Sequence, residues 1–183
     1  MMTIHRIAVE KMTEQTFEPY GELMISKETP PFEGTPYRVN FDGGDVRVGT
    51  NWLPYKGFQF TGLEQHLHVS QSFIHLQGAP AFVAVAASAG SGRGTQIPKP
   101  EDVRIFLIEP HTGYLLKKGT WHSDRLPLYP PGSMMVIITD EETNLDLQEF
   151  GSMTTDPSKR GGWQWNTLVD FSYSYGVTFE AVL

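Results

Sequence analysis

Three side chains that can bind a metal ion or transfer a proton alternate along one stretch, GLEQHLHVSQSFIHL (residues 62–76). Successive side chains of a β-strand point to opposite faces, so Glu64, His66 and His68 would project to the same side. Imidazole and carboxylate groups are common metal ligands, and imidazole also titrates near neutral pH. The spacing is compatible with a metal site or an acid/base pair, and equally with an ordinary hydrogen-bonded strand.

A second stretch, KKGTWHS (residues 117–123), places His122 shortly after a glycine turn. A His-x-His strand followed by a Gly-x-x-His turn resembles the two halves of a cupin metal site. We therefore expect His66, His68 and His122 to be candidate ligands of a divalent metal ion such as Zn, Ni or Mn. No organic cofactor is expected.

The match to a cupin site is incomplete. Cupins usually carry a glutamate four or five residues after the second histidine, and this chain has Ser72 and Phe73 there. Gln71 offers a nearby oxygen donor, but a neutral one. The other histidines are expected to be surface or packing residues without a catalytic role: His5, His75 and His111.

The elements that must position these residues are short strands. The 18 glycines and 13 prolines are scattered along the chain, which favours many turns over long helices. Strands are predicted at residues 46–55, 81–87, 103–109 and 133–139, and one or two more within 167–183. The acidic segment TDEETNLDLQE lacks the spacing of a calcium loop and is predicted to be a solvated loop. The fold class predicted is all-β, a cupin-like antiparallel β-barrel or sandwich with a few short helices.

Composition limits the domain count and the partners. The 183 residues suffice for a single domain with a sizeable core, in which residues 150–183 are expected to be a C-terminal extension that completes or flanks the barrel. A net charge of −7 argues against nucleic acid, although local cations could still bind a small anionic substrate. There is no cysteine, no signal-peptide pattern, and no apolar run long enough to cross a bilayer. We expect a soluble, cytoplasmic protein without a membrane partner.

Four segments together resemble the ureidoglycolate lyase family, also called ureidoglycolate hydrolase. LEQHLHVSQSFIHLQGAPAFVAVA is similar to the family pattern Leu-Glu-Arg-His, Ser/Thr-Gln-x-Phe-Ile-Pro-Leu and an apolar strand. VRIFLIEPHTGYLLKKGTWHS resembles its Arg-Ala-Phe strand and Gly-Thr-Trp-His-His turn, and FEPYGELM its Phe-x-x-Tyr-Gly-Asp opening. MVIITDEETNLD falls where the family has a hydrophobic strand, Asp-Arg and a later Asn. The resemblance spans roughly residues 14–146 in the correct order.

This resemblance implies a cupin-like barrel, usually dimeric, that releases urea from ureidoglycolate to give glyoxylate. The positions that match the family are Glu64, His66, Gln71, Trp121 and His122. On that basis we predict that His66 and His122 form the acid/base pair and that Glu64 orients one imidazole. The residues predicted to bind the substrate are Gln71, Lys118 and Trp121.

Several polar positions of the family pattern differ in this chain, which leaves the substrate open. The differing positions are Leu116, Lys117, Ser123, Ile138, Thr139 and Leu145. One alternative is a metal-dependent cupin isomerase or lyase acting on a sugar acid or a related 2-hydroxy acid, with His68 as a ligand. Another is a non-catalytic ligand-binding or regulatory barrel.

Overall fold

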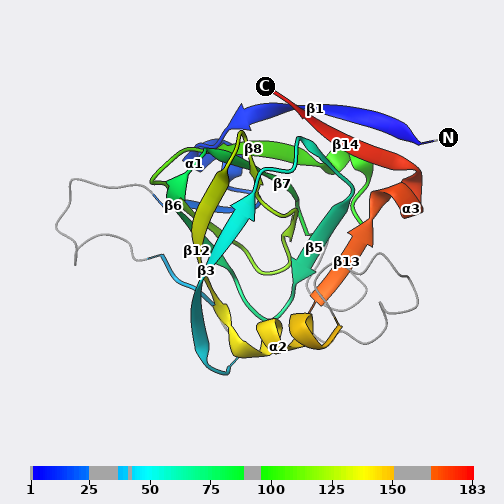
Figure 1. The fold of residues 1–183 in the computed structure, drawn as a ribbon. Coiled ribbons are helices and arrows are strands. Elements are labelled where there is room, and N and C mark those ends of the chain that lie inside the picture. The colour runs from blue at the N-terminus through cyan, green and yellow to red at the C-terminus, as the bar shows by residue number, and fades with distance from the viewer. Residues whose placement is uncertain (1, 25–36, 41–42, 89–95, 151–165) are drawn as a thin grey trace.

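The computed structural model describes residues 2–24, 37–40, 43–88, 96–150 and 166–183 (Figure 1). Short strands in two sheets make up most of this chain, and the helices are few and short. The all-β, cupin-like prediction is therefore confirmed. No helix in these ranges has the length and apolar character needed to cross a membrane.

The larger sheet has the strand order β13-β5-β10-β7-β8-β1-β14-β4, with β11 added beside β7. Its members are β1 (Thr3–Lys11), β4 (Gln59–Phe60), β5 (Gly62–His66), β7 (Ala81–Ala86), β8 (Arg104–Ile108), β10 (Trp121–His122), β11 (Leu126–Pro127), β13 (Asn166–Asp170) and β14 (Val177–Val182). Most pairs are antiparallel as expected, but β1 runs parallel to both β8 and β14. Figure 1 shows β1 and β14 side by side, so the two ends of the chain meet in one sheet.

The smaller sheet has the order β2-β9-β6-β12-β3 and is antiparallel throughout. Its members are β2 (Gly21–Met24), β3 (Val46–Pro54), β6 (Ser72–Gly78), β9 (Gly113–Leu116) and β12 (Gly132–Asp140). The helices are α1 (Glu14–Phe17), the 3-10 turn η1 (Pro100–Asp102), α2 (Glu141–Phe150) and α3 (Phe171–Tyr175).

Strand β7 explains how the core is divided, because all six of its residues are buried. Ala81, Val83 and Val85 belong to a cluster that includes Phe73 of β6 and other residues of the smaller sheet. The alternate β7 residues belong to a second cluster, built with Trp121, Phe171 and Phe179. At β7 the larger sheet is therefore covered on both faces, as the continuous apolar sequence of that strand predicts.

The acidic segment after β12 is helix α2, so the prediction of a solvated loop is wrong. The carboxylate of Asp140 accepts a hydrogen bond from the backbone N–H of Thr143 at 3.0 Å, as an N-terminal cap does. Two glutamates in the first turn add favourable charge at that helix end. Helix α2 lies between the ends of β12 and β13 (Figure 1).

Candidate active site

Two neighbouring strands bring three of the predicted site residues together. Glu64 and His66 project from the same face of β5, and His122 on β10 pairs directly with Glu64 across the sheet. Glu64 Oε1 lies 3.4 Å from His122 Nε2 and 3.7 Å from His66 Nε2. The two imidazole centroids are 5.0 Å apart, which confirms the predicted proximity of His66 and His122. We call these three residues the Glu64 cluster.

The protonation of the His66 ring follows from its neighbour Asn166 on β13. His66 Nδ1 donates a hydrogen bond to Asn166 Oδ1. The amide nitrogen of Asn166 is already used, since it donates to Asp146 Oδ2 at 2.7 Å and to the Thr143 carbonyl at 3.1 Å. The proton of a neutral His66 is therefore held on Nδ1, and the lone pair of Nε2 faces Glu64.

His122 is oriented in the same way by a backbone carbonyl. Its Nδ1 lies 3.2 Å from the Thr120 oxygen, which can only accept, so Nδ1 carries the proton. Its Nε2 is buried and has no hydrogen-bond partner among the described residues. Burial lowers the pKa of His122, although the Glu64 carboxylate opposes this shift. Burial would by itself raise the pKa of Glu64, but the two adjacent imidazoles outweigh it and hold that pKa well below its usual range.

Three electron-pair donors therefore converge in the Glu64 cluster, two ring nitrogens and a carboxylate oxygen, all within 4.8 Å of one another. Such a group needs a shared proton or a cation to be stable. Two imidazoles and one carboxylate, with a further position left open, are also the ligand set of many catalytic zinc sites. The cluster can thus move protons or hold a divalent metal ion.

His68 does not join this cluster, so the predicted grouping of Glu64, His66 and His68 on one strand face is wrong. Strand β5 ends at His66, which pairs with Asn166, the first residue of β13. The chain then bends, and His68 Nδ1 donates to Asp140 Oδ2. His68, Asp140 and Glu142 form a second group able to hold a metal ion. We call it the Asp140 cluster.

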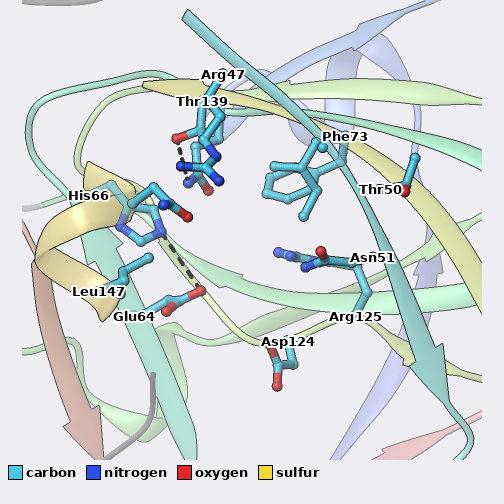
Figure 2. Close-up of a pocket in the computed structure, with 14 residues that line it drawn as sticks. Arg47, Thr50, Asn51, Glu64, His66, Phe73, Asp124, Arg125, Thr139 and Leu147 are labelled. Atoms are coloured by element: carbon cyan, nitrogen blue, oxygen red, sulfur yellow. Dashed lines mark hydrogen bonds and ion pairs between the residues drawn. The ribbon is translucent and has the colours of Figure 1, made fainter. Parts of the chain in front are cut away.

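Glu64 and His66 of the Glu64 cluster line a cavity of about 420 Å³, whereas the buried His122 is not among its lining residues. Residues of β3, β5, β6, β12 and α2 line it, together with Asp124 and Arg125. Gln71 is on the wall and donates to Thr139 Oγ1 at 3.1 Å. Figure 2 shows Glu64 and His66 on one side of this cavity and Phe73 with Arg125 on the other.

Trp121 and Lys118, both predicted to bind the substrate, are not among the described residues that line this cavity. Trp121 precedes His122 on β10 and so points to the other face of the sheet, where it is fully buried in the second core cluster. Lys118 lies half-buried in the turn before β10. Neither residue lines the cavity.

Most positions that differ from the family pattern have packing or surface roles in this chain. Leu116 is part of the core, and Lys117 forms an exposed ion pair with Glu18 at 2.9 Å. The Ser123 hydroxyl accepts a hydrogen bond from the backbone N–H of Ala84 at 3.0 Å. These differences therefore leave the geometry of the Glu64 cluster intact.

Two residues of the site were not predicted. Asn166 lies beyond the segments that resemble the family, and nothing in the sequence pairs it with His66. Arg125 belongs to no motif, although its guanidinium lies 3.9 Å from the Phe73 ring centroid. The only sequence signal for Arg125 is that a charged residue follows three positions after His122.

Comparison with known proteins gives a consistent result. A family model described as ureidoglycolate lyase matches residues 4–156. The chain is 37% identical to a ureidoglycolate lyase of Azotobacter vinelandii, over 72% of this chain and 83% of that protein. It is 27% identical to a ureidoglycolate lyase of Brucella anthropi, over 84% of this chain and 95% of that protein. A Burkholderia cepacia protein of the same name is 28% identical over 72% of this chain and 78% of its own length.

Proposed function

The chain belongs to the ureidoglycolate lyase family, and we propose that it cleaves ureidoglycolate into glyoxylate and urea. The observation that carries this proposal is the Glu64 cluster, in which two correctly oriented imidazoles face one carboxylate at a cavity wall. A cavity of about 420 Å³ is of the size that small-molecule sites have.

The reaction needs one base and one acid. The carbon atom whose bond to nitrogen is cleaved carries both a hydroxyl group and the ureido nitrogen. When a base removes the hydroxyl proton, that electron pair forms the C=O bond of glyoxylate. The C–N bond then breaks with its electrons going to nitrogen, which takes up a proton to complete urea. Protons and electrons both balance in this reaction without an oxidant or a reductant, so no organic cofactor is proposed.

We assign the base to His122 and the acid to His66. Burial lowers the pKa of His122, so its Nε2 is unprotonated at neutral pH and free to accept the hydroxyl proton. Glu64, 3.4 Å from that nitrogen, stabilises the imidazolium that forms. The proton that the Glu64 cluster shares, when it lies on His66 Nε2, passes to the departing nitrogen, while Asn166 holds Nδ1 of the same ring. The hydroxyl proton taken up by His122 then replaces it in the cluster. Gln71 can orient the substrate from the wall of the cavity.

The same three atoms also fit a divalent metal ion, and we propose Zn, Ni or Mn, with Glu64 in the place first assigned to His68. A bound ion would supply positive charge that polarises the substrate oxygens. Imidazoles that serve as ligands cannot also transfer protons. The metal content of the active protein therefore decides which of these two roles His66 and His122 have.

The test is release of urea from racemic ureidoglycolate by the purified protein, before and after chelation and after addition of each metal. We expect urea release above the spontaneous decay of the substrate. Equal activity after complete chelation would assign proton transfer to the histidines. Stabilisation by the substrate without urea release would replace this proposal with the binding-protein alternative, and turnover of a sugar acid instead would replace it with the isomerase or lyase alternative.

We also propose that the protein is a homodimer. Strand β3 is at an edge of the smaller sheet and exposes apolar side chains, among them Val46, Val48 and Trp52. Exposed apolar side chains on an edge strand are typical of a surface that a second chain covers. Sedimentation of the purified protein as a monomer at micromolar concentration would contradict this assignment.

A further inference from the structure

Arg125 brings a buried cation to the wall of the cavity. The residue is only 6% exposed, and its guanidinium lies 3.9 Å from the Phe73 ring centroid. Its Nε and Nη1 atoms have no hydrogen-bond partner among the described residues. A buried ionised group with unused donors is costly unless an anion completes it. The Asp124 carboxylate lines the same cavity and interacts electrostatically with Arg125, but no ion pair joins the two among the described residues. Arg125 can therefore still bind an anion from the cavity.

This cation and the Glu64 cluster face the same space. Arg125, Glu64 and His66 all line the cavity, and Figure 2 shows the Arg125 guanidinium beneath Phe73, across from His66. The Phe73 ring connects the two sides, because its centroid also lies 6.1 Å from that of His122. An anionic group held by Arg125 would direct the adjoining carbon atom towards the imidazoles.

Other cations near the cavity are less suited to this role. Arg47 also lines it, but its side chain is 44% exposed and forms an ion pair with Glu141 at 2.6 Å. Lys118, predicted from the sequence to bind the substrate carboxylate, does not line the cavity. A guanidinium also presents two parallel N–H groups that match the two oxygens of a carboxylate.

We propose that Arg125 binds the carboxylate of the substrate and thereby restricts the site to small 2-hydroxy carboxylates. This inference rests on the proposed function, and it adds the residue that selects the substrate class. In a 2-hydroxy acid the carboxylate is directly bonded to the carbon that carries the hydroxyl group. Fixing the carboxylate at Arg125 therefore also fixes that carbon beside the acid/base pair. An uncharged amide would leave Arg125 buried and unpaired, so the site should reject it.

The first measurement compares glycolate with its neutral amide, glycolamide, by titration calorimetry. Glycolate keeps the hydroxyl and carboxylate of ureidoglycolate but lacks the reactive C–N bond. Loss of one partner of a buried charged pair weakens binding by about 10²-fold or more, so the wild type should prefer glycolate by that factor. In Arg125→Gln this preference should disappear. Arg125→Lys keeps the positive charge but lacks the planar guanidinium, so it should retain part of the preference for glycolate.

The second measurement is the kinetics of ureidoglycolate cleavage by the same variants. We expect kcat/KM of Arg125→Gln to fall by about 10²-fold, mostly through a higher KM. Arg6→Gln is the matched control, because Arg6 has a 66% exposed side chain and pairs with Glu180 outside the cavity. That variant should match the wild type in both measurements, and thermal unfolding shows whether each protein is folded.

The outcomes separate this inference from the proposed function. If the wild type binds glycolate no better than glycolamide, or if folded Arg125→Gln keeps the preference, the role of Arg125 is overturned. Should Arg125→Gln fail to fold, Arg125→Lys decides, and an unchanged preference in that variant overturns the bidentate contact. A wild type that prefers glycolate but releases no urea would support Arg125 and reject the lyase activity.

Discussion

The Glu64 cluster and the Asp140 cluster begin from histidines two positions apart, yet their hydrogen bonds differ. In the Glu64 cluster, neighbouring oxygens hold Nδ1 of both imidazoles, which leaves the two Nε2 atoms facing Glu64 at the cavity wall. In the Asp140 cluster, both oxygens of the Asp140 carboxylate are occupied. Asp140 Oδ1 caps α2 through Thr143, and Oδ2 accepts from His68.

The comparison shows that a set of metal-binding residue types is not sufficient evidence of a site. What distinguishes the Glu64 cluster is its position, since Glu64 and His66 line the cavity and no residue of the Asp140 cluster does. A buried atom without a hydrogen-bond partner among the described residues occurs in both clusters, at His122 Nε2 and at Glu142 Oε2. The Asp140 carboxylate already has two structural roles, since it holds His68 in the bend after β5 and caps the start of α2. We therefore expect catalysis to depend on the first cluster and folding to depend on the second.

The largest effect is expected for His122→Ala. This change removes the proposed base in one version of the chemistry and a metal ligand in the other. A positioned acid or base contributes about 10²–10⁴-fold, so urea release should fall by that factor. The melting temperature should change less than the activity, since the buried imidazole belongs to neither apolar core cluster and its Nε2 has no hydrogen-bond partner among the described residues. Steady-state kinetics and thermal unfolding measure the two quantities.

His111→Ala is the control for this variant, because His111 is exposed and does not line the cavity. It should retain wild-type kinetics. A folded His122→Ala protein with near-normal turnover would remove the Glu64 cluster from the mechanism, whichever substrate proves correct.

The next largest effect is expected for Asn166→Ala, which releases the His66 ring without touching the substrate. Partners that orient such a histidine typically contribute about 10–100-fold, so kcat should fall by that factor while KM changes little. Val169→Ala is the matched control from the same strand, since Val169 is buried in the second core cluster. It should lose stability but keep kcat. Equal kcat losses in both variants would indicate a general disturbance of β13 instead.

His68→Gln should show the opposite pattern, a loss of stability with activity retained. Without the imidazole, the fully buried Asp140 loses a hydrogen bond, which costs about 1–3 kcal/mol of the free energy of unfolding. Bound zinc or nickel per chain, measured after dialysis, should be unchanged in this variant and reduced in His122→Ala. Loss of metal from His68→Gln alone would show that the Asp140 cluster is the metal site.

Much of the fold could be predicted because short strands leave a local signal. The apolar run at 81–86 and the alternating segments around it are the strands of the structure. Helix α2 was missed because its acidic composition suggested solvent exposure. The Asp140 cap, followed by two glutamates, was the sequence signal for that helix.

The site was predictable only as far as local periodicity extends. The alternation of side chains along a strand correctly placed Glu64 and His66 on one face. It could not show that the pairing of β5 with β13 ends at His66. The same rule applied to β10 would have placed Trp121 away from His122. The roles of Arg125 and Asn166 depend on contacts with residues 52 and 100 positions away, which no local pattern contains.

The smallest effect is expected for His75→Leu, which tests whether a buried, unpartnered imidazole nitrogen is by itself a mark of the site. Like Nε2 of His122, Nδ1 of His75 is buried without a hydrogen-bond partner among the described residues. His75 differs because it belongs to neither cluster, whereas His122 lies beside the Glu64 carboxylate at the cavity wall. Its Nε2 donates to the Ala79 carbonyl, which also accepts from Ser133 and so stays satisfied without it. Losing this bond while removing the unsatisfied Nδ1 should change the free energy of unfolding by at most about 1 kcal/mol, with kcat and KM unchanged. Denaturant unfolding and steady-state kinetics provide the measurement. A large kinetic loss in a folded His75→Leu protein would show that an unsatisfied imidazole matters even without a carboxylate or a cavity beside it, which would remove the basis for distinguishing the two clusters.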